Sequence, residues 1–289
     1  MSSPNYSEKS KLPIGIFDSG MGGLTVLHEL MKHLPQESFI YLGDTARLPY
    51  GTKSVETIRN YSRQMASALL EQNIKLLIIA CNTATAAALT YLEELFPQIP
   101  IIGVIKPGAV AAINATKSNK IAVLATEATI TSGIYEQTLR TLNPDVRIVS
   151  QSCGLFVALA EEGCVDDELV EAAAKKYLLP VLNNGIQCDC VLLGCTHFPV
   201  LIKPIKRILG SAITVVNSAK TTAVAVAETL EKLNLKNGAE KSTTKFLVTD
   251  LPERFIRVGK IFLERAINPD MVFLIDSIKY YYHSSEGTE

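Results

Sequence analysis

The chain alternates short apolar runs with longer amphipathic stretches. Most short runs are nearly continuous in valine, isoleucine and leucine, which is typical of parallel strands with helices on both faces. The pattern predicts an α/β protein in which layers of helices cover mostly parallel sheets. The expected strands are 13–17, 38–43, 75–80, 100–105, 120–125, 146–150, 190–194, 213–217, 245–249 and 272–275, and the expected helices include 54–72, 84–95, 131–142, 166–183 and 219–232.

One local pattern occurs twice. The apolar run at 75–80 leads into Cys81, polar residues and an alanine-rich helix pattern, and the run at 190–194 leads into Cys195 in nearly the same way. This repetition favours two similar doubly wound domains with an active site in the cleft between them. We expect residues 1–105 plus 218–289 to form one domain, completed by the C-terminal segment, and residues 106–217 to form the other.

Polar, often glycine-containing turns follow several of the expected strands. Ligands of doubly wound sheets gather at the carboxyl ends of the strands, so these turns mark the expected cleft. Together they supply Asp, Ser, Thr, Asn, Cys and His side chains. The turns are "FDSGMGG", "GDTARLPYG", "CNTA", "LATEAT" and "GCTHFP".

Cys81 and Cys195 are the most distinctive of these polar positions. A single cysteine at a strand end is usually a small buried apolar residue, but two at matching corners favour chemistry. A helix N-terminus stabilises a thiolate, which acts as a base or nucleophile. Two thiols facing one cleft could form a redox disulfide. Alternatively, one could be a nucleophile while the other has no role in the chemistry, or the two could exchange the proton of one carbon from opposite faces. Redox pairs usually have C-x-x-C spacing, which neither cysteine has.

The residues near the two thiols each have a structural and a functional interpretation. The glycines after Asp18 and Ser19 indicate a tight turn and match neither a P-loop nor G-x-G-x-x-G. His197 is a plausible acid–base partner for Cys195, whereas Glu161 alone would be interpreted as an exposed helical acid. The segment at 49–51 reads as a turn, although Tyr50 and the N–H of Gly51 could receive a carboxylate.

Composition narrows the class of protein. The 289 residues are 47% hydrophobic and 20% charged with a net charge of −1, which favours a filled core and argues against a nucleic-acid or membrane-surface protein. No apolar run approaches the roughly 18 residues of a membrane span, and the N-terminus has no signal-peptide core. We therefore expect a cytoplasmic protein with reduced thiols and packing roles for the other four cysteines. Cysteine and histidine spacing predicts no metal site.

The motifs "FDSGMGG", "GDTARLPYG", "ACNTATA", "GVIKPG", "FVALAEEG" and "GCTHFP" are similar, in this order, to those of the glutamate racemases of the aspartate/glutamate racemase superfamily. The resemblance runs from about residue 13 to the last strands. It implies interconversion of L- and D-glutamate without a cofactor, which supplies D-glutamate for peptidoglycan. It also implies a small-molecule substrate held between two α/β domains, and a homodimer.

The resemblance assigns roles to individual residues. Cys81 and Cys195 look like the catalytic thiols, which in the family deprotonate D-glutamate and L-glutamate respectively. Asp18 resembles the acid that assists the first thiol, and His197 and Glu161 resemble the groups that assist the second. The substrate-contacting positions are Asp18, Ser19, Pro49, Tyr50, Gly51, Asn82, Thr83, Thr126, Thr196 and His197.

The chain departs from the family pattern at a few places that bear on loop stiffness and domain crossover. Gly154, which follows Cys153, and Ala158 both stand where the family commonly has proline. Asn217 stands where the family usually has aspartate. Two other functions remain open: racemisation of aspartate or another amino acid, and a non-enzymatic amino-acid-binding protein on the same fold.

Overall fold

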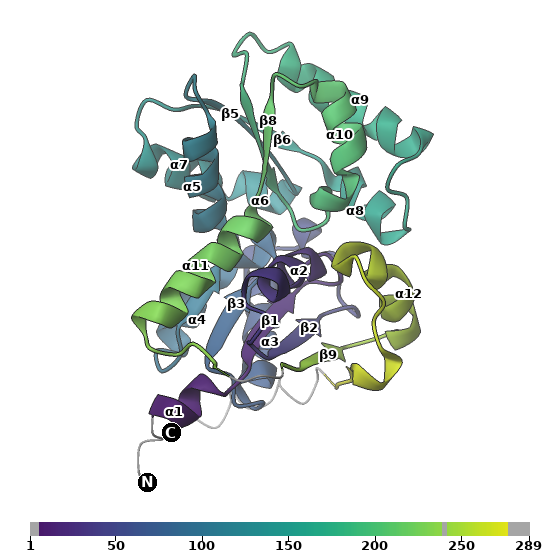
Figure 1. The fold of residues 1–289 in the computed structure, drawn as a ribbon. Helices are drawn as coiled ribbons and strands as arrows, with labels where there is room; N and C mark the ends of the chain where they lie inside the picture. Colours follow the sequence, from purple (N-terminus) through teal and green to yellow (C-terminus); the bar gives the residue numbers. More distant parts are fainter. Residues whose placement is uncertain (1–5, 239–241, 277–289) are drawn as a thin grey trace.

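The computed structural model describes residues 6–238 and 242–276, which form two parallel sheets, each with helices on both faces (Figure 1). The larger sheet has six strands in the order β10-β9-β2-β1-β3-β4. Its strands are β1 (Ile14–Asp18), β2 (Phe39–Gly43), β3 (Leu76–Ile79), β4 (Ile101–Gly103), β9 (Thr244–Val248) and β10 (Val272–Leu274). The helical elements of this half are α1 (Tyr6–Ser10), α2 (Leu24–His33), η1 (Tyr50–Thr52), α3 (Val55–Leu70), α4 (Asn82–Leu95), α11 (Ser218–Lys232), α12 (Pro252–Leu263) and η3 (Pro269–Met271).

The smaller sheet has four strands in the order β6-β5-β7-β8. These strands are β5 (Lys120–Ala125), β6 (Arg147–Ser152), β7 (Cys190–Gly194) and β8 (Thr214–Asn217). The helical elements of this half are α5 (Ile105–Ala115), α6 (Glu127–Thr131), α7 (Ile134–Leu142), α8 (Gly154–Glu161), α9 (Glu168–Leu182), η2 (Phe198–Leu201) and α10 (Ile202–Leu209).

The two sheets share one topology. The order β6-β5-β7-β8 repeats β2-β1-β3-β4, and all neighbouring strands described in both sheets run parallel. Cys81 follows β3 and Cys195 follows β7, so the two thiols occupy equivalent positions of the repeat. The predicted fold class, two similar doubly wound sheets, is confirmed. The exact domain boundaries stay a proposal, which rests on the chain passing between the sheets at 103–105 and at 217–218.

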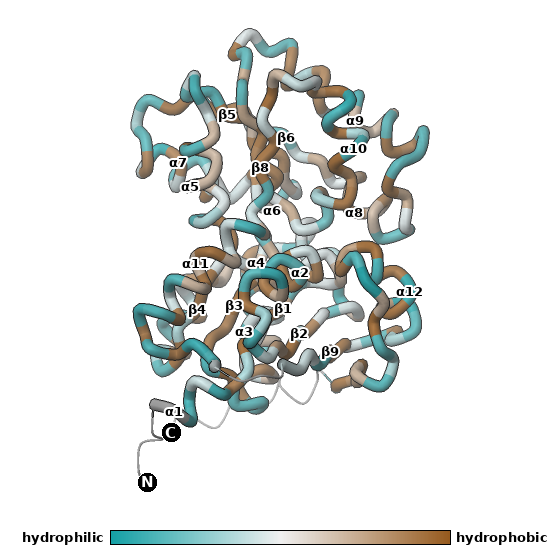
Figure 2. The backbone as a smooth tube through the Cα atoms, viewed as in Figure 1, coloured by the Kyte–Doolittle hydropathy of each residue, from teal (hydrophilic) through white to brown (hydrophobic). Residues whose placement is uncertain are grey.

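Apolar residues on both faces of each sheet explain the continuous hydrophobic runs in the sequence. Ile14 and Ile16 of β1 pack in one core with α2, while Phe17 packs on the opposite face in a core with α3 and α4. The smaller sheet likewise divides its residues between a core with α5 and α7 and a core with α8, α9 and α10. The strands accordingly appear as the mostly hydrophobic interior segments of the backbone trace (Figure 2).

Three predicted elements differ from the structure at their ends. The helix expected at 131–142 is α7, which begins only at Ile134, because Gly133 adopts φ +66° between the short helix α6 and α7. The strand expected at 100–105 is shorter because α5 already begins at Ile105. Helix α4 begins before residue 84 because the thiol of Cys81 accepts the backbone N–H of Ala84 and caps it.

Asn217 also acts as a cap, at the chain's second passage between the sheets. Its side-chain oxygen accepts the N–H of Ala219 at 2.6 Å at the start of α11. Asparagine and aspartate are equally good N-caps, so this departure from the family pattern keeps the local structure. Gly154 and Ala158 are both exposed on α8 and lie outside the core.

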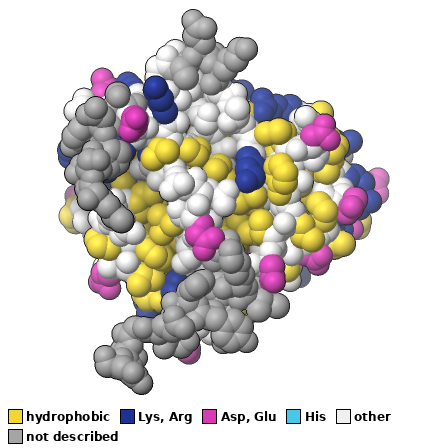
Figure 3. Space-filling model, turned by 90° about the horizontal axis from the view of Figure 1, so that it is seen from below, with side chains coloured by type: hydrophobic (Ala, Val, Ile, Leu, Met, Phe, Trp, Pro, Cys, Tyr) yellow, Lys and Arg dark blue, Asp and Glu magenta, His cyan; other side chains and the backbone are white. Residues whose placement is uncertain are grey.

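The surface of the larger half carries mixed side chains. Seen from below, hydrophobic side chains form short bands among lysine, arginine, aspartate and glutamate side chains (Figure 3). Within the described residues, no helix has the length and apolar character needed to cross a membrane.

A buried ion pair joins four segments at the amino-terminal ends of the strands of the larger sheet. Lys75 Nζ contacts Glu37 Oε2 at 2.5 Å and also donates to the carbonyl oxygens of Ser10 and Leu235. The other Glu37 oxygen accepts the N–H of Asn237 at 2.8 Å. The exposed fractions of the two charged side chains are only 1% and 3%, so each charge depends on the other for compensation.

Replacing Lys75→Met should lower the free energy of unfolding by about 3–5 kcal/mol, because it leaves the Glu37 carboxylate buried and unpaired. Urea unfolding followed by circular dichroism measures the change. The matched control combines Lys75→Met with Glu37→Gln, which keeps an acceptor for Asn237 but removes the charge. This double variant should be more stable than the single one; an equal loss in both would contradict the ion-pair account.

Candidate active site

The carboxyl ends of the two sheets enclose a small cavity. Its volume is about 20 Å³, which is room for about one water molecule. Every residue that the resemblance assigned to the site lines it except Asp18, which accepts a hydrogen bond from the lining residue Thr196. The lining residues are Ser19, Leu48, Pro49, Tyr50, Gly51, Cys81, Asn82, Thr83, Thr126, Val157, Glu161, Cys195, Thr196 and His197.

Cys81 lies at the corner between β3 and α4. Its sulfur accepts the N–H of Ala84 at 3.4 Å and lies 3.5 Å from Ser19 Oγ. Burial and then the charge of Asp18 raise the pKa of the Cys81 thiol to about 12, although these two hydrogen bonds act in the opposite direction. Cys81 therefore holds its proton at neutral pH in this closed arrangement.

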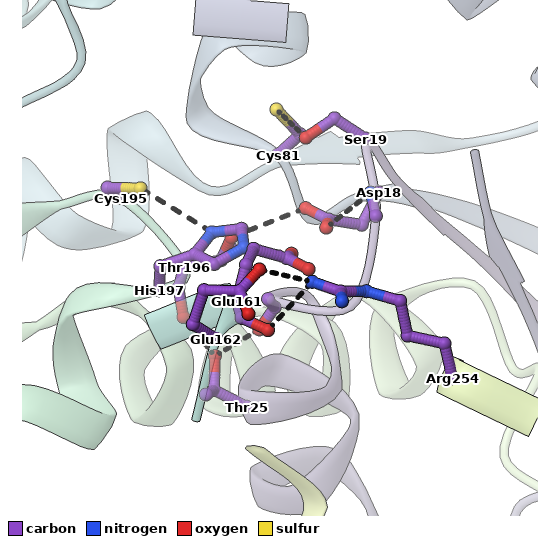
Figure 4. Close-up of polar contacts among 12 residues, drawn as sticks. Asp18, Ser19, Thr25, Cys81, Glu161, Glu162, Cys195, Thr196, His197 and Arg254 are labelled. Atoms are coloured by element: carbon purple, nitrogen blue, oxygen red, sulfur yellow. Dashed lines mark hydrogen bonds and ion pairs between the residues drawn. The ribbon is translucent and has the colours of Figure 1, made fainter. Parts of the chain in front are cut away.

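Cys195 has different partners at the equivalent corner after β7. Its sulfur lies 3.8 Å from His197 Nδ1, and His197 Nε2 lies 2.7 Å from Glu161 Oε1, so the three side chains form a relay (Figure 4). Burial opposes protonation of His197, but its hydrogen bonds with Cys195 and Glu161 hold its pKa well above the usual value. Phe262 of α12 packs edge-on against the imidazole at 5.3 Å between ring centroids.

Asp18 connects the two corners. Its carboxylate accepts the N–H of Gly20 at 3.0 Å and the hydroxyl of Thr196 at 3.3 Å across the cleft (Figure 4). Burial raises the pKa of Asp18, while the nearby charge of His197 lowers it. Glycine is needed at residue 22, where a Cβ would lie 2.5 Å from both His197 Nδ1 and Thr196 Oγ1.

Three threonine hydroxyls form a ring between the two halves. Thr83 lies at the start of α4, whereas Thr126 and Thr129 belong to the turn and helix after β5. The distances between their oxygens are 2.9, 3.1 and 2.9 Å, and all three side chains are buried. Hydroxyl groups both donate and accept, so this ring can turn its protons toward a bound anion.

The hydroxyl of Tyr50, which was considered as a donor to a substrate carboxylate, is already bonded within the protein. Its hydroxyl donates to Asp44, which also accepts from Arg47 and from Thr249. The phenol thus holds the 49–51 turn in place, and Tyr50 and Gly51 both line the cavity. Gly51 is close-packed there, because a Cβ would lie 2.7 Å from Thr126 Cβ.

Two buried polar atoms of the site have no hydrogen-bond partner within the described residues. They are Asn82 Nδ2, a donor, and Glu161 Oε2, an acceptor. Burying an unpaired polar group costs about 1–3 kcal/mol, and such groups are found where a ligand completes the pairing. The site therefore offers a free donor beside Cys81 and a free acceptor beside His197.

Sequence reasoning missed four residues that build the site. Thr129 completes the hydroxyl ring and Phe262 packs on His197. Arg254 donates to the carbonyl oxygen of Glu161 at 3.0 Å and to the Glu162 carboxylate, which fixes the end of α8 (Figure 4). Tyr135 donates to Asn82 Oδ1. Tyr135, Arg254 and Phe262 lie on helices whose sequence pattern indicates only packing, whereas Thr129 belongs to the "LATEAT" turn, which did mark the cleft.

All six cysteines are free thiols. Among the described residues no three His, Cys, Asp or Glu side chains are grouped so as to hold a metal ion. Cys81 and the Cys195–His197–Glu161 relay line the same cavity, an arrangement suited to acid–base chemistry.

This fold and site define a two-domain α/β protein with one thiol on each side of a closed cavity. The chain belongs to the Asp/Glu/hydantoin racemase family, whose model matches residues 24–226. The predicted resemblance is thereby confirmed.

Individual relatives are similar over most of their length. The chain is 48% identical to the glutamate racemase of Geobacter metallireducens over 251 residues, which is 86% of this chain and 92% of the relative. The crystal structure of the Francisella tularensis glutamate racemase in complex with D-glutamate superposes with a TM-score of 0.87 at 37% identity, covering 94% of this chain and all of the other. The Thermus thermophilus glutamate racemase gives a TM-score of 0.82 at 38% identity, covering 92% of this chain and 98% of the other.

Replacing Glu161→Gln should lower the pKa of His197, because the imidazolium loses a charged acceptor that favours it. The protonated state should then disappear at a lower pH than in the parent protein. An NMR titration of the His197 ring nitrogens measures this shift. Glu162→Gln is the matched control on the exposed side of α8 and should leave the titration in place. A His197 pKa that does not move in the Glu161 variant would contradict the relay.

Proposed function

We propose that this protein interconverts L-glutamate and D-glutamate with two thiols: one removes the α-proton, and the other delivers a different proton to the opposite face of the carbon. The observation that carries the proposal is the placement of Cys81 and Cys195 at equivalent strand ends facing one cavity. Inversion at one carbon requires a base on one face and an acid on the other. A duplicated strand–thiol–polar corner supplies both, and the curated relatives named glutamate racemase support glutamate as the substrate.

In the proposed direction from L- to D-glutamate, Cys195 removes the α-proton. The imidazole of His197 lies beside this thiol, and Glu161 orients it and stabilises its protonated form. Cys81, whose pKa is raised to about 12, carries a proton and delivers it to the opposite face. The reverse reaction exchanges the two roles, with Asp18 and Ser19 assisting Cys81.

The substrate carries two carboxylates, which require hydrogen-bond donors. The N-terminus of α4 with Asn82 and Thr83 offers one group of donors, and Thr196 and the 50–51 backbone offer others. Ser19, Thr126 and Pro49 complete the lining around the substrate. Donors at helix N-termini also stabilise the negative charge that develops when the α-carbon loses its proton.

The proposed reaction moves only protons, so its balance needs neither a redox cofactor nor a covalent carrier. The α-proton of an amino acid is poorly acidic, and excluding water strengthens the electrostatic stabilisation of the carbanion. The closed cavity of about 20 Å³ is far smaller than a glutamate molecule. We infer that the two halves separate to admit substrate and then close around it.

We also propose a cytoplasmic role in which the D-glutamate product supplies peptidoglycan synthesis, and a homodimeric assembly. The thiol chemistry requires a reducing compartment, which supports the cytoplasmic location.

Light scattering coupled to size-exclusion chromatography tests the proposed homodimer. A mass near twice 31.4 kDa supports the dimer, and a mass near 31.4 kDa contradicts it.

The test of function is D-glutamate formation from L-glutamate without any added cofactor, measured by chiral chromatography. Cys81→Ala and Cys195→Ala should each abolish it in both directions, with a loss of at least about 10³-fold. Cys164→Ala, which replaces a thiol outside the cavity, is the control and should keep activity. Full activity in either site variant would refute the two-thiol mechanism.

Substrate choice is tested with L-aspartate in the same assay. Aspartate is one methylene shorter, and a single methylene changes binding by about 1–3 kcal/mol in a fitted site. Glutamate should therefore be favoured by at least about tenfold in kcat/KM. Preference for aspartate would support the alternative racemase, and binding of glutamate without turnover would support an amino-acid-binding protein.

A further inference from the structure

Tyr135 contacts both thiol-bearing corners although it lies outside every sequence motif of the site. It belongs to α7, which packs on the smaller sheet, and its side chain is 2% exposed. The ring lies against Gly194, the residue before Cys195, where a Cβ would be only 2.8 Å from Tyr135 Cε2. Its hydroxyl reaches the start of α4 and donates to Asn82 Oδ1 at 2.6 Å.

The hydroxyl of Tyr135 can act only as a protonated phenol here. Burial, and then the charge of Cys195, raise the pKa of Tyr135 above its usual value. A buried O–H without an acceptor costs about 1–3 kcal/mol, so Asn82 is favoured with its carbonyl oxygen toward the phenol. The amide of Asn82 is then turned with its NH₂ group away from Tyr135.

The opposite end of the same amide is the free donor of the site. Asn82 Nδ2 is buried, has no partner within the described part of the chain, and belongs to a residue that lines the cavity. If the amide were reversed, a carbonyl oxygen would stand in its place and repel a substrate carboxylate. The hydrogen bond from Tyr135 therefore decides whether Asn82 attracts or repels the substrate.

We propose that Tyr135 is a positioning residue for substrate binding: by holding the carbonyl oxygen of Asn82, it keeps the Asn82 N–H groups directed at a carboxylate of the amino-acid substrate. This inference rests on the proposed function, because that function supplies the carboxylate. The bond runs from a helix of the smaller half to a helix of the larger half, so the donor is set only when the two halves are closed.

Tyr135→Phe tests the inference with the least change in shape. The ring still fills the space beside Gly194, but the Asn82 amide loses the group that orients it. We expect KM for L-glutamate to rise roughly tenfold with kcat within about threefold, because an interaction made equally with substrate and transition state is weakened. Tyr177→Phe is the matched control: its hydroxyl accepts the N–H of Leu155 at 3.1 Å outside the cavity, so KM should be unchanged.

A double-mutant cycle with Asn82 distinguishes positioning from a merely structural effect. Asn82→Ala should raise KM by itself, and adding Tyr135→Phe should then change KM by less than about twofold. The inference is overturned if Tyr135→Phe raises KM by the same factor with and without Asn82. It is equally overturned if Tyr135→Phe lowers only the melting temperature or only kcat.

The proposed function and this inference can fail separately. If the parent protein racemises no amino acid, the proposed function fails, and the dissociation constant of L-glutamate from calorimetry replaces KM in the same cycle. If the parent protein is an active racemase and Tyr135→Phe keeps its KM, the inference alone fails.

Discussion

The hydrogen bonds that cross between the two sheets hold the cavity closed, and the chemistry of both thiols depends on that closure. Thr83 bonds Thr126 and Thr129, Asp18 accepts from Thr196, and Asn82 accepts from Tyr135. Such bonds contribute about 0.5–1.5 kcal/mol each, which is small enough for the halves to separate and large enough, together, to favour closure. A site that must exclude water and still admit substrate needs this balance.

The duplicated topology gives the two faces of the cavity the same scaffold but different chemistry. Cys81 follows β3 and Cys195 follows the equivalent strand β7. Only Cys195 lies next to a histidine, which in turn bonds a carboxylate. Cys81 has the hydroxyl of Ser19 and the N-terminus of α4, and its pKa is raised to about 12. The closed arrangement therefore places a protonated thiol opposite a thiol–imidazole pair, which suits proton removal on the Cys195 side.

The fold was predictable from the sequence because its signal is local. Continuous apolar runs identify strands covered on both faces, and the repeated corners at Cys81 and Cys195 identify the two halves. The motif-bearing residues from Ser19 to His197 also lie together as the resemblance implied, and their catalytic roles stay proposals. Tyr135 and Phe262 could not be predicted, because they reach the site from helices whose sequence pattern reports only burial, whereas Thr129 lies in the "LATEAT" turn that marked the cleft. The start of the helix predicted at 131–142 was placed three residues too early, because nothing in the sequence except the glycine itself shows that Gly133 adopts a positive φ.

The central claim is that two different groups handle the α-proton, one on each face of the carbon. Racemisation of L-glutamate in D₂O, stopped at low conversion and resolved by chiral chromatography with mass spectrometry, tests it most directly. With a base on one face and an acid on the other, newly formed D-glutamate should carry deuterium at the α-carbon while the unreacted L-glutamate keeps its hydrogen. D-glutamate that retains the original hydrogen, or equal deuterium in product and recovered substrate, would indicate a single base and contradict the account.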